Sequence, residues 1–219
     1  KLLNLSSAVF TMNEATRQKL LSDGIKQDIV RTTFIGIDPD LFYPSKKKIH
    51  KNKPVIGFNL RYQPQQSYFT RKNYDTIVEI IKQVNFCEVI LLGKDWQEYD
   101  RFSEIQNLPY FTYVESSYRE YQQYYAKMDV FVSVSRLEGG PVPLLEAMFC
   151  NVFPVVTKTG FAPDLITDGE NGILLDVESS VDEIIEKIKR SIDQSNNNNV
   201  SAAVRHLTWN KYEQNVVKY

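Results

Sequence analysis

The chain alternates between short apolar runs and amphipathic stretches, and this alternation limits the folds available to it more than any other feature. Apolar runs of strand length occur at residues 8–12, 54–60, 87–93, 110–114, 129–135, 152–157 and 172–176. Strands that alternate with helices predict right-handed βαβ units. The expected fold class is therefore α/β, with a parallel sheet covered by helices on both faces.

The helices between these strands can be placed from their caps and apolar stripes. Asn13 is a good N-cap, and Gly24 is a natural stop for the helix that follows it. Asn73 is expected to cap a second helix, whose apolar positions form one stripe: Ile77, Ile80, Ile81 and Val84. Residues 62–72 are largely polar and are expected to form a loop. Further helices are expected at residues 97–105, 118–128, 143–149 and 179–192.

Composition excludes several classes of protein. The hydrophobic content of 42% and charged content of 24% are those of a soluble globular protein. The net charge of -1 argues against a nucleic-acid partner, and no run approaches the ~20 apolar residues of a membrane span. Cys87 and Cys150 match neither a disulfide framework nor a metal site, so a cytoplasmic location is expected. His50 and His206 are expected to have surface or packing roles.

The most distinctive stretch is "RLEGGPVPLLEAM" at residues 136–148, which leaves the predicted strand 129–135 at its carboxyl end. Ligands of open α/β sheets bind beyond the carboxyl ends of the strands. Gly139 and Gly140 let a ligand approach the backbone closely, and Pro143 suits the first turn of a helix. The N-terminus of that helix is a potential anion site.

Glu138 and Glu146 stand on either side of this change from loop to helix. A carboxylate that accepts hydrogen bonds from hydroxyls, close to an anion site, fits a nucleotide or a sugar phosphate. The alternative interpretation is that Glu146 only complements the helix dipole and that the Gly-Gly-Pro sequence only forms a turn. Local physical chemistry alone leaves both interpretations open.

The stretch "SRLEGGPVPLLEAM" resembles the E-x7-E motif of family 4 retaining glycosyltransferases, also called group 1, which have the GT-B fold. The resemblance continues in "FIGIDPDLFYP" (34–44), "KMDVFVSVS" (127–135), "FPVVTKTGFAPDLITDGENGILLD" (153–176) and "LTWNKYEQNVVKY" (207–219). It covers nearly the whole chain, with the motifs in the order of the family. It implies a Rossmann-like donor-binding domain, the C-terminal half of a GT-B enzyme.

The resemblance also implies roles for individual residues. Glu146 matches the glutamate that binds the ribose, and Glu138 matches the one that contacts the donor sugar. Arg61 and Lys72 are the best matches for the cations that hold the diphosphate, with Arg71 as a substitute, and they would stabilise the leaving group. The backbone of the loop and the helix start would contact sugar and phosphate: Gly139, Gly140, Val142 and Leu144.

Three positions depart from the family pattern. Pro141 has no N–H and removes one backbone donor from the loop. Asn151 replaces a glycine that usually ends the helix, and Asp164 replaces a glutamate after Pro163. These differences leave the identity of the donor sugar open.

The resemblance implies that residues 1–44 are the end of an N-terminal acceptor domain with its link, and that residues 45–219 are the nucleotide-sugar-binding domain. The polar stretch 45–53 would mark the boundary. The rest of the N-terminal domain would be missing, so this piece alone is expected to be inactive. The longer protein could lie peripherally at the inner face of a membrane.

The expected activity of the longer protein is transfer of a sugar from a nucleotide diphosphate sugar to a glycan or lipid-linked acceptor, in polysaccharide or glycoconjugate biosynthesis. No cofactor and no metal are expected. Three alternatives remain. A non-catalytic nucleotide-sugar-binding module would keep Glu146. A dehydrogenase would need a G-x-G-x-x-G motif, which follows no early strand. A metal-dependent transferase could use the D-x-D spacing of Asp38 and Asp40, although a turn fits these residues better.

Overall fold

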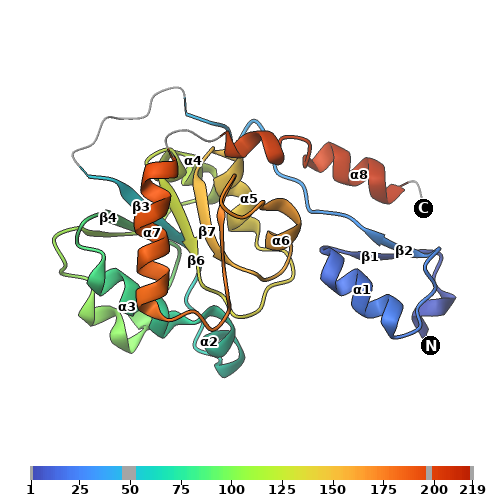
Figure 1. The fold of residues 1–219 in the computed structure, drawn as a ribbon, viewed down its shortest axis with the longest axis horizontal. Coiled ribbons are helices and arrows are strands. Elements are labelled where there is room, and N and C mark those ends of the chain that lie inside the picture. The colour runs from blue at the N-terminus through green and yellow to red at the C-terminus, as the bar shows by residue number, and fades with distance from the viewer. Residues whose placement is uncertain (1, 46–52, 196–198, 218–219) are drawn as a thin grey trace.

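The computed structural model describes residues 2–45, 53–195 and 199–217. His50 therefore lies outside the described residues, and so does the expected boundary at 45–53 except for its first and last residues. The described chain contains a two-stranded sheet and a six-stranded sheet. The small sheet lies to one side of the large one, near the N-terminus (Figure 1).

The large sheet confirms the α/β class. Its order is β5-β4-β3-β6-β7-β8, and all of its paired strands are parallel. Its strands form where the sequence predicts them, because they are apolar runs long enough to be buried on both faces. They are β3 (Val55–Asn59), β4 (Glu88–Leu92), β5 (Phe111–Val114), β6 (Val130–Ser133), β7 (Phe153–Thr157) and β8 (Ile173–Leu175).

The chain changes direction across the sheet at the junction of β3 and β6. From β3 it winds outward to β4 and β5, and from β6 it winds the other way to β7 and β8. Right-handed crossovers in opposite directions place helices on opposite faces. Accordingly α3 (Tyr74–Gln83) packs with α7 (Val181–Ser195), whereas α5 (Val142–Phe149) joins β6 to β7. Loops that leave β3 and β6 diverge, which opens a crevice between them.

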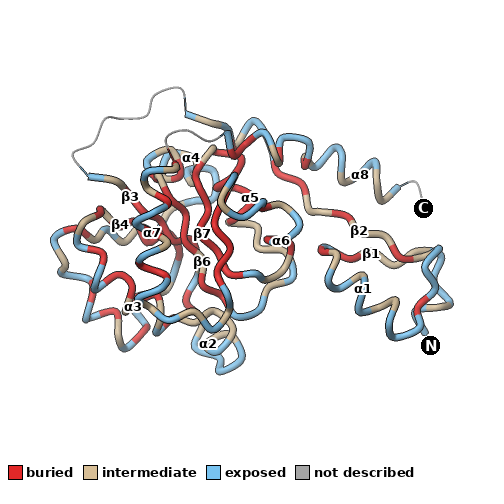
Figure 2. Tube along the Cα trace, viewed as in Figure 1, coloured by how far each residue is buried: buried red, intermediate tan, exposed pale blue. Residues whose placement is uncertain are grey.

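The core lies between the sheet and these helices (Figure 2). Every residue of β3 and of β7 is buried. The predicted stripe on α3 is confirmed, since these four side chains are at most 2% exposed: Ile77, Ile80, Ile81 and Val84. Among the described residues, none of the helices has both the length and the apolar character required to cross a bilayer.

The N-terminal segment forms a separate small unit. It contains η1 (Leu2–Leu5), β1 (Val9–Thr11), α1 (Glu14–Ser22) and β2 (Val30–Thr32), and β1 pairs with β2 in parallel. Asn13 caps α1 as predicted, because its side chain accepts a hydrogen bond from the N–H of Thr16. Neither η1 nor β2 was predicted.

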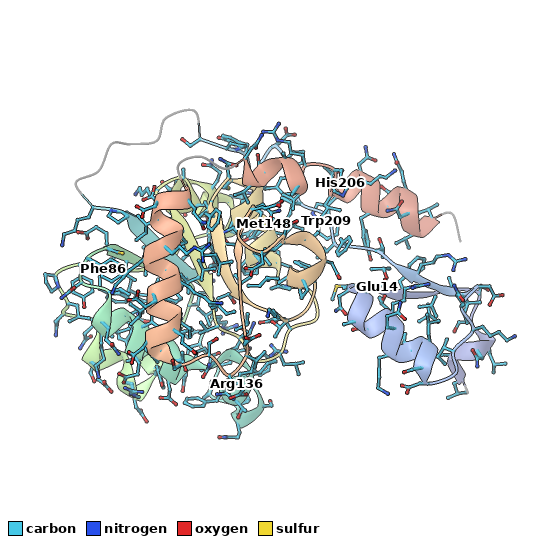
Figure 3. The ribbon with its side chains drawn as sticks, viewed as in Figure 1. Glu14, Phe86, Arg136, Met148, His206 and Trp209 are labelled. Atoms are coloured by element: carbon cyan, nitrogen blue, oxygen red, sulfur yellow. The ribbon has the colours of Figure 1, made fainter. Side chains whose placement is uncertain are left out.

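Residues 33–42 connect this unit to the large sheet and pass against the C-terminal segment. The N–H of Ile37 donates to the carbonyl of Leu207 at 2.9 Å. A Cβ on Gly36 would lie 2.2 Å from the backbone nitrogen of Trp209, so only glycine fits there. Trp209 begins α8 (Trp209–Val217), and Figure 3 shows it between the large sheet and the small unit.

Three helical segments differ from the sequence prediction. The segment expected to be a loop contains α2 (Gln66–Lys72). The helix expected at 97–105 is replaced by two 3-10 helices, η2 (Trp96–Glu98) and η3 (Asp100–Glu104). The helix expected at 118–128 is divided into η4 (Tyr118–Glu120) and the short α4 (Tyr121–Tyr125). Two further short helices were not predicted: α6 (Ala162–Leu165) and η5 (Val200–Ala203).

Candidate functional site

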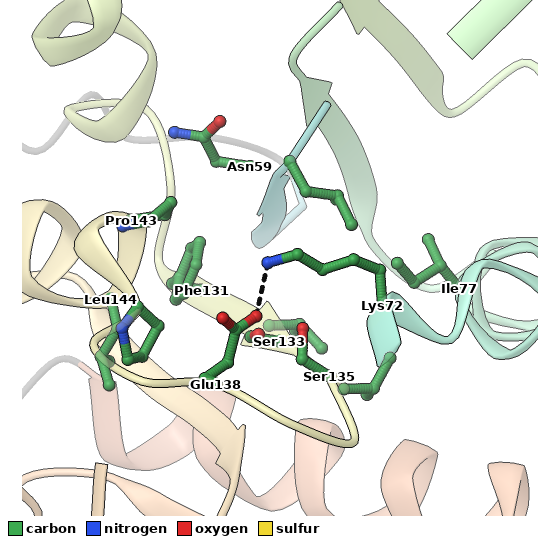
Figure 4. Close-up of a pocket in the computed structure, with 13 residues that line it drawn as sticks. Asn59, Lys72, Ile77, Phe131, Ser133, Ser135, Glu138, Pro143 and Leu144 are labelled. Atoms are coloured by element: carbon green, nitrogen blue, oxygen red, sulfur yellow. Dashed lines mark hydrogen bonds and ion pairs between the residues drawn. The ribbon is translucent and has the colours of Figure 1, made fainter. Parts of the chain in front are cut away.

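A pocket lies at the carboxyl ends of β3 and β6, where the sheet topology places a ligand crevice (Figure 4). It encloses about 30 Å³, room for about one water molecule. Asn59, at the end of β3, and Leu60, just after it, bound one side, and the strand β6 with the loop after it bounds the other. The remaining lining residues are Lys72, Ile77, Phe131, Val132, Ser133, Val134, Ser135, Glu138, Pro141, Pro143 and Leu144.

An ion pair lines this pocket. The Nζ of Lys72 lies 2.5 Å from Oε1 of Glu138. The side chains are 21% and 10% exposed, so the pair is well shielded from solvent. The sequence assigned these two residues to one site, and the structure brings them together. A diphosphate that approaches the Lys72 ammonium would meet the Glu138 carboxylate already bound to it.

The end of α2 places Lys72 at the pocket. Asn73 has a left-handed backbone, with φ 59°, and is shared between the end of α2 and the start of α3. Its amide donates to the carbonyl of Val134 at 3.3 Å, and the carbonyl of Arg71 accepts from the N–H of Arg136 at 2.7 Å. These contacts attach α2 to the loop after β6. Asn73 occupies the N-cap position of α3 as predicted, but its side chain makes no capping bond to the backbone there.

Gly140 is packed tightly, whereas Gly139 makes only an ordinary van der Waals contact. A Cβ on Gly140 would lie 2.8 Å from the ring of Phe161, and one on Gly139 would lie 3.5 Å from Met12. The carbonyl of Gly139 accepts a hydrogen bond from the amide of Asn13 at 2.8 Å. After Pro141 the chain enters α5 without a side-chain cap, and Pro143 lies in its first turn as predicted. Pro143 has no N–H, and the N–H groups of Leu144 and Leu145 donate to the carbonyl of Pro141. At this helix start the N–H of Val142, which has no acceptor among the described residues, is left for an anion.

Glu146 points into the protein and is 1% exposed. Its Oε2 accepts a hydrogen bond from the hydroxyl of Tyr125 at 2.8 Å, and the amide of Asn59 donates to the same hydroxyl at 2.7 Å. The amide of Asn59 also lies 3.5 Å from Oε2. Burial raises the pKa of Glu146, and hydrogen bonds from Tyr125 and Tyr118 partly offset that effect.

Asn59 and Tyr125 were not predicted as site residues. The one signal in the sequence was a polar residue, Asn59, at the end of an otherwise apolar run. Nothing local to residues 118–128 indicates that the hydroxyl of Tyr125 meets a carboxylate. Together the two residues hold one oxygen of Glu146 in place, which fixes the direction of the carboxyl group.

The predicted arginines lie outside this pocket. The Nε of Arg61 lies 2.5 Å from Oδ2 of Asp95, and its side chain is 63% exposed. The guanidinium of Arg71 lies 4.5 Å from the ring centre of Tyr68. The buried Nε of Arg71 has no hydrogen-bond partner within residues 2–45, 53–195 and 199–217. The structure therefore brings Lys72 to Glu138, but it brings neither Arg61 nor Arg71 to the pocket. Of the other predicted donor residues, Leu144 lines the pocket, and Val142 packs against the core.

The aspartates of the D-x-D spacing form a turn. Oδ1 of Asp38 accepts a hydrogen bond from the N–H of Asp40 at 2.9 Å. In the part of the chain that the structure describes, no group of three or more histidine, cysteine or acidic residues could hold a metal ion. Cys87 and Cys150 are buried thiols, and His206 is exposed.

Comparison with known proteins gives one family. The family profile described as "Glycosyl transferases group 1" matches residues 43–206. A glycosyltransferase of Methanocaldococcus jannaschii is 26% identical over 129 residues, which cover 58% of this chain and 36% of that protein. A 41.2 kDa protein of the cps region of Klebsiella pneumoniae is 24% identical over 138 residues, which cover 62% and 36%. The chain thus spans about a third of the length of these relatives.

Solved structures share the fold. Sucrose-phosphate synthase from Thermosynechococcus elongatus matches with a TM-score of 0.81 and 19% identity, over 99% of this chain and 58% of that one. The Anabaena protein HepE, solved in complex with UDP-glucose, matches with a TM-score of 0.73 and 20% identity, over 97% and 63%. These likenesses identify the chain's architecture as part of the GT-B fold.

Proposed function

Because the chain belongs to the glycosyl transferases of group 1, we propose that it forms the donor-binding part of a retaining glycosyltransferase that takes a sugar from a nucleoside diphosphate sugar. The observation that carries the proposal is the meeting of Lys72, Glu138 and the start of α5 at the junction of β3 and β6. A cation, a carboxylate and the positive end of the α5 dipole there suit a sugar diphosphate.

In this proposal each residue has a separate role. The ammonium of Lys72 stabilises the diphosphate as it gains charge on leaving the sugar. Glu138 contacts the sugar hydroxyls once the diphosphate has displaced it from Lys72. The buried carboxylate of Glu146 accepts hydrogen bonds from the ribose. Arg61 and Arg71 add positive charge at the rim, where each would have to turn toward the ligand.

The loop supplies the backbone contacts. We propose that Gly139 and Gly140 lie against the sugar and the phosphates, and that Val142 and Leu144 form the wall at the start of α5. Neither a metal nor a cofactor is part of this proposal, because Lys72 and the helix N-terminus supply the positive charge.

The domain assignment is part of the same proposal. Residues 1–44 would belong to an acceptor-binding domain and its link, and residues 45–219 would form the donor domain. The acceptor would be a glycan or a lipid-linked sugar, and the product would enter polysaccharide or glycoconjugate synthesis. The Anabaena neighbour that was solved with UDP-glucose supports the choice of a nucleotide sugar as donor. The second candidate function, a non-catalytic nucleotide-sugar-binding module, would share this donor site.

Titration calorimetry with UDP, GDP and ADP, in the presence of a chelator, tests the donor site. We expect one of these ligands to bind, and Glu146→Ala to weaken it about ten- to a hundred-fold, since a charge-assisted hydrogen bond contributes roughly 1.5–3 kcal/mol. Lys72→Ala should also weaken binding. Lys158→Ala is the matched control, because Lys158 is likewise ion-paired, to Asp176 at 2.8 Å, but lies outside the pocket.

Lack of binding by all three nucleotides, or binding that depends on a divalent metal, would contradict the proposed site. Transfer assays then separate the enzyme from the binding module. The enzyme predicts that a longer protein containing this chain transfers sugar from the nucleotide sugar, and that Lys72→Ala abolishes the transfer. Binding of the donor without any transfer would favour the module.

A further inference from the structure

Asn13 uses both ends of its side chain, and the two ends serve different units of the molecule. Its Oδ1 accepts from the N–H of Thr16 at 2.7 Å and caps α1. Its Nδ2 donates to the carbonyl of Gly139 at 2.8 Å, a contact between residues 126 positions apart. Asn13 is buried. Capping needs only the oxygen, so the amide nitrogen is left to bind the glycine loop.

The peptide between Gly139 and Gly140 is the part of the loop that most needs holding. Two adjacent glycines have more backbone freedom than any other pair of residues. A peptide group is planar and trans, so holding the carbonyl of Gly139 also fixes the direction of the N–H of Gly140. No residue in the described ranges accepts a hydrogen bond from that N–H. It remains available to a ligand.

A second contact attaches the same end of α1 to the donor domain. The N–H of Glu14, in the first turn of α1, donates to Oδ2 of Asp164 at 2.9 Å. A carboxylate at a helix N-terminus is favourable for both the N–H group and the helix dipole. Figure 3 shows Glu14 at the end of α1 that faces the six-stranded sheet. Asp164 follows the loop of Gly160 and Phe161, which packs on the other side of the glycine pair.

We propose that Asn13 is a positioning residue of the donor site: it holds the Gly139–Gly140 peptide in the orientation that receives the sugar diphosphate. Donor affinity then depends on the docking of the small N-terminal unit, with Asp164 as the second point of attachment. The inference rests on the donor site proposed above. Asn13 then has a role beyond helix capping, and the carboxylate of Asp164 helps to attach the N-terminal unit.

The test separates the two functions of Asn13. Serine caps helices as well as asparagine does but lacks the amide donor, so Asn13→Ser keeps α1 and removes the contact to Gly139. Asn4→Ser is the matched control. Asn4 makes the same two kinds of bond within the N-terminal unit, since its amide donates to the carbonyl of Gly24 at 3.1 Å and its Oδ1 accepts from the N–H of Lys26 at 3.0 Å.

Calorimetry is carried out with whichever of UDP, GDP and ADP the unmodified chain binds most tightly, and with the corresponding nucleoside. Asn13→Ser should weaken the diphosphate about ten-fold, the expected effect of having to order one more residue on binding. The nucleoside, which does not reach the loop, should bind as before. Hydrogen exchange of residues 137–143 should become faster in the unliganded variant and slow again at saturation.

Asp164 provides an independent pair of variants. Asp164→Ala should also weaken the diphosphate, whereas Asp164→Asn, which keeps an oxygen for the N–H of Glu14, should bind nearly as the unmodified chain does. Equal affinities of Asn13→Ser and Asn4→Ser for the diphosphate would overturn the inference and leave the donor site standing. An equal loss for nucleoside and diphosphate would overturn it as well. If the unmodified chain binds no nucleoside diphosphate, the proposed function itself fails.

Discussion

Glu146 is a carboxylic acid inside a protein, and this position has a thermodynamic consequence. Desolvation penalises its charged form more than its neutral form, which is why burial raises its pKa. The hydroxyl of Tyr125 donates to the carboxylate and reduces the penalty without removing it. At neutral pH, the buried charge of the residue proposed to bind the ribose therefore lowers the stability of the unliganded fold.

Replacing Glu146 by glutamine should therefore stabilise the unliganded protein. A raised folded-state pKa means that the stability contributed by the protonated acid is present below the unfolded pKa and is lost as the pH rises through the folded pKa. At pH 8 the charged form is buried, and Glu146→Gln should raise the midpoint of thermal unfolding by about 2–4 °C, the shift that roughly 1 kcal/mol produces in a domain of this size.

The gain should vanish when thermal unfolding is repeated at a pH low enough to protonate Glu146 in the folded protein. The same variant should bind nucleotide more weakly than the unmodified chain. A lower midpoint at pH 8 would show that the hydrogen bonds of the carboxylate outweigh its desolvation.

Glu138 competes with any anionic ligand for Lys72, because the two residues already form an ion pair. Glu138→Ala removes that competitor, so the affinity for a free nucleoside diphosphate should rise by up to about five-fold, in keeping with at most ~1 kcal/mol for a partly exposed pair. Affinity for the nucleotide sugar should gain less, because the sugar loses its contact. Calorimetry with both ligands makes the comparison.

Glu178→Ala is the control for this experiment. Glu178 pairs with Arg136 at 3.0 Å, in the loop that also carries Glu138, and neither residue of this pair lines the pocket. This variant should leave both affinities unchanged. A weaker affinity of Glu138→Ala for the free diphosphate would contradict the competition and assign Glu138 a direct role in the phosphate site.

At the scale of elements, α2 decides where the lysine of the site lies. The helix ends at Lys72, and the left-handed Asn73 turns the chain directly into α3. The side chain of Asn73 also accepts from the hydroxyl of Thr76 at 2.9 Å and donates to the carbonyl of Val134. One residue thus sets the angle between two helices and attaches both to the loop after β6.

Asn73→Ala should destabilise the protein by more than Asn73→Gly does. Both lose the side-chain bonds, but alanine is also strained at φ 59°, by roughly 1–2 kcal/mol relative to glycine. Urea unfolding measures the difference. Asn151 has the same backbone conformation, φ 61°, away from the pocket. Asn151→Ala should therefore lower stability without affecting nucleotide affinity, whereas Asn73→Ala should lower both.

The strands could be predicted from sequence because a continuous apolar run buried on both faces has few alternatives. The helix α2 could not, because residues 62–72 have no apolar stripe and its position depends on contacts to Val134 and Arg136. The missed strand β2 has three residues and forms only by pairing with β1. Periodicity also cannot distinguish a 3-10 helix from a short α-helix, which explains the error at residues 97–105.

Part of the candidate site could likewise be predicted from the sequence, and part could not. The loop from Glu138 to the start of α5 could be predicted because its residue types are local and unusual. The partners of that loop could not. Asn13 meets Gly139 across 126 positions, and Asn59 meets Tyr125 across 66. Such pairs depend on how separate units dock, and no local pattern encodes that. The expectation that Arg61 and Lys72 share one site illustrates the limit, because in the structure Arg61 binds Asp95 instead.

At the scale of the whole molecule, the two sheets differ greatly in what holds them together. The six-stranded sheet has a core on both faces. The two-stranded sheet has three residues in each strand, too few to be stable alone. It depends on α1 and on the contacts that Asn13 and Glu14 make to Gly139 and Asp164.

The reversal of strand order at β3 and β6 has a kinetic consequence. The pair that forms the site joins distant parts of the chain: the N–H of Val55 donates to Oδ2 of Asp129 at 2.8 Å, across 74 positions. Closing so long a loop carries a larger entropic cost than pairing β3 with the nearby β4. In refolding from urea, the fluorescence of the buried Trp96 beside β4 should recover before nucleotide binding does, measured in a Trp209→Phe background by stopped flow.

Simultaneous recovery of both signals would instead indicate a single cooperative step. If the order holds, the crevice cannot exist in any partly folded chain, because its two walls come from halves that meet last. A nascent chain would then be unable to sequester nucleotide sugar before its structure is complete. Ligand binding would then occur only once folding is complete. A saturating nucleotide would therefore slow unfolding without accelerating refolding.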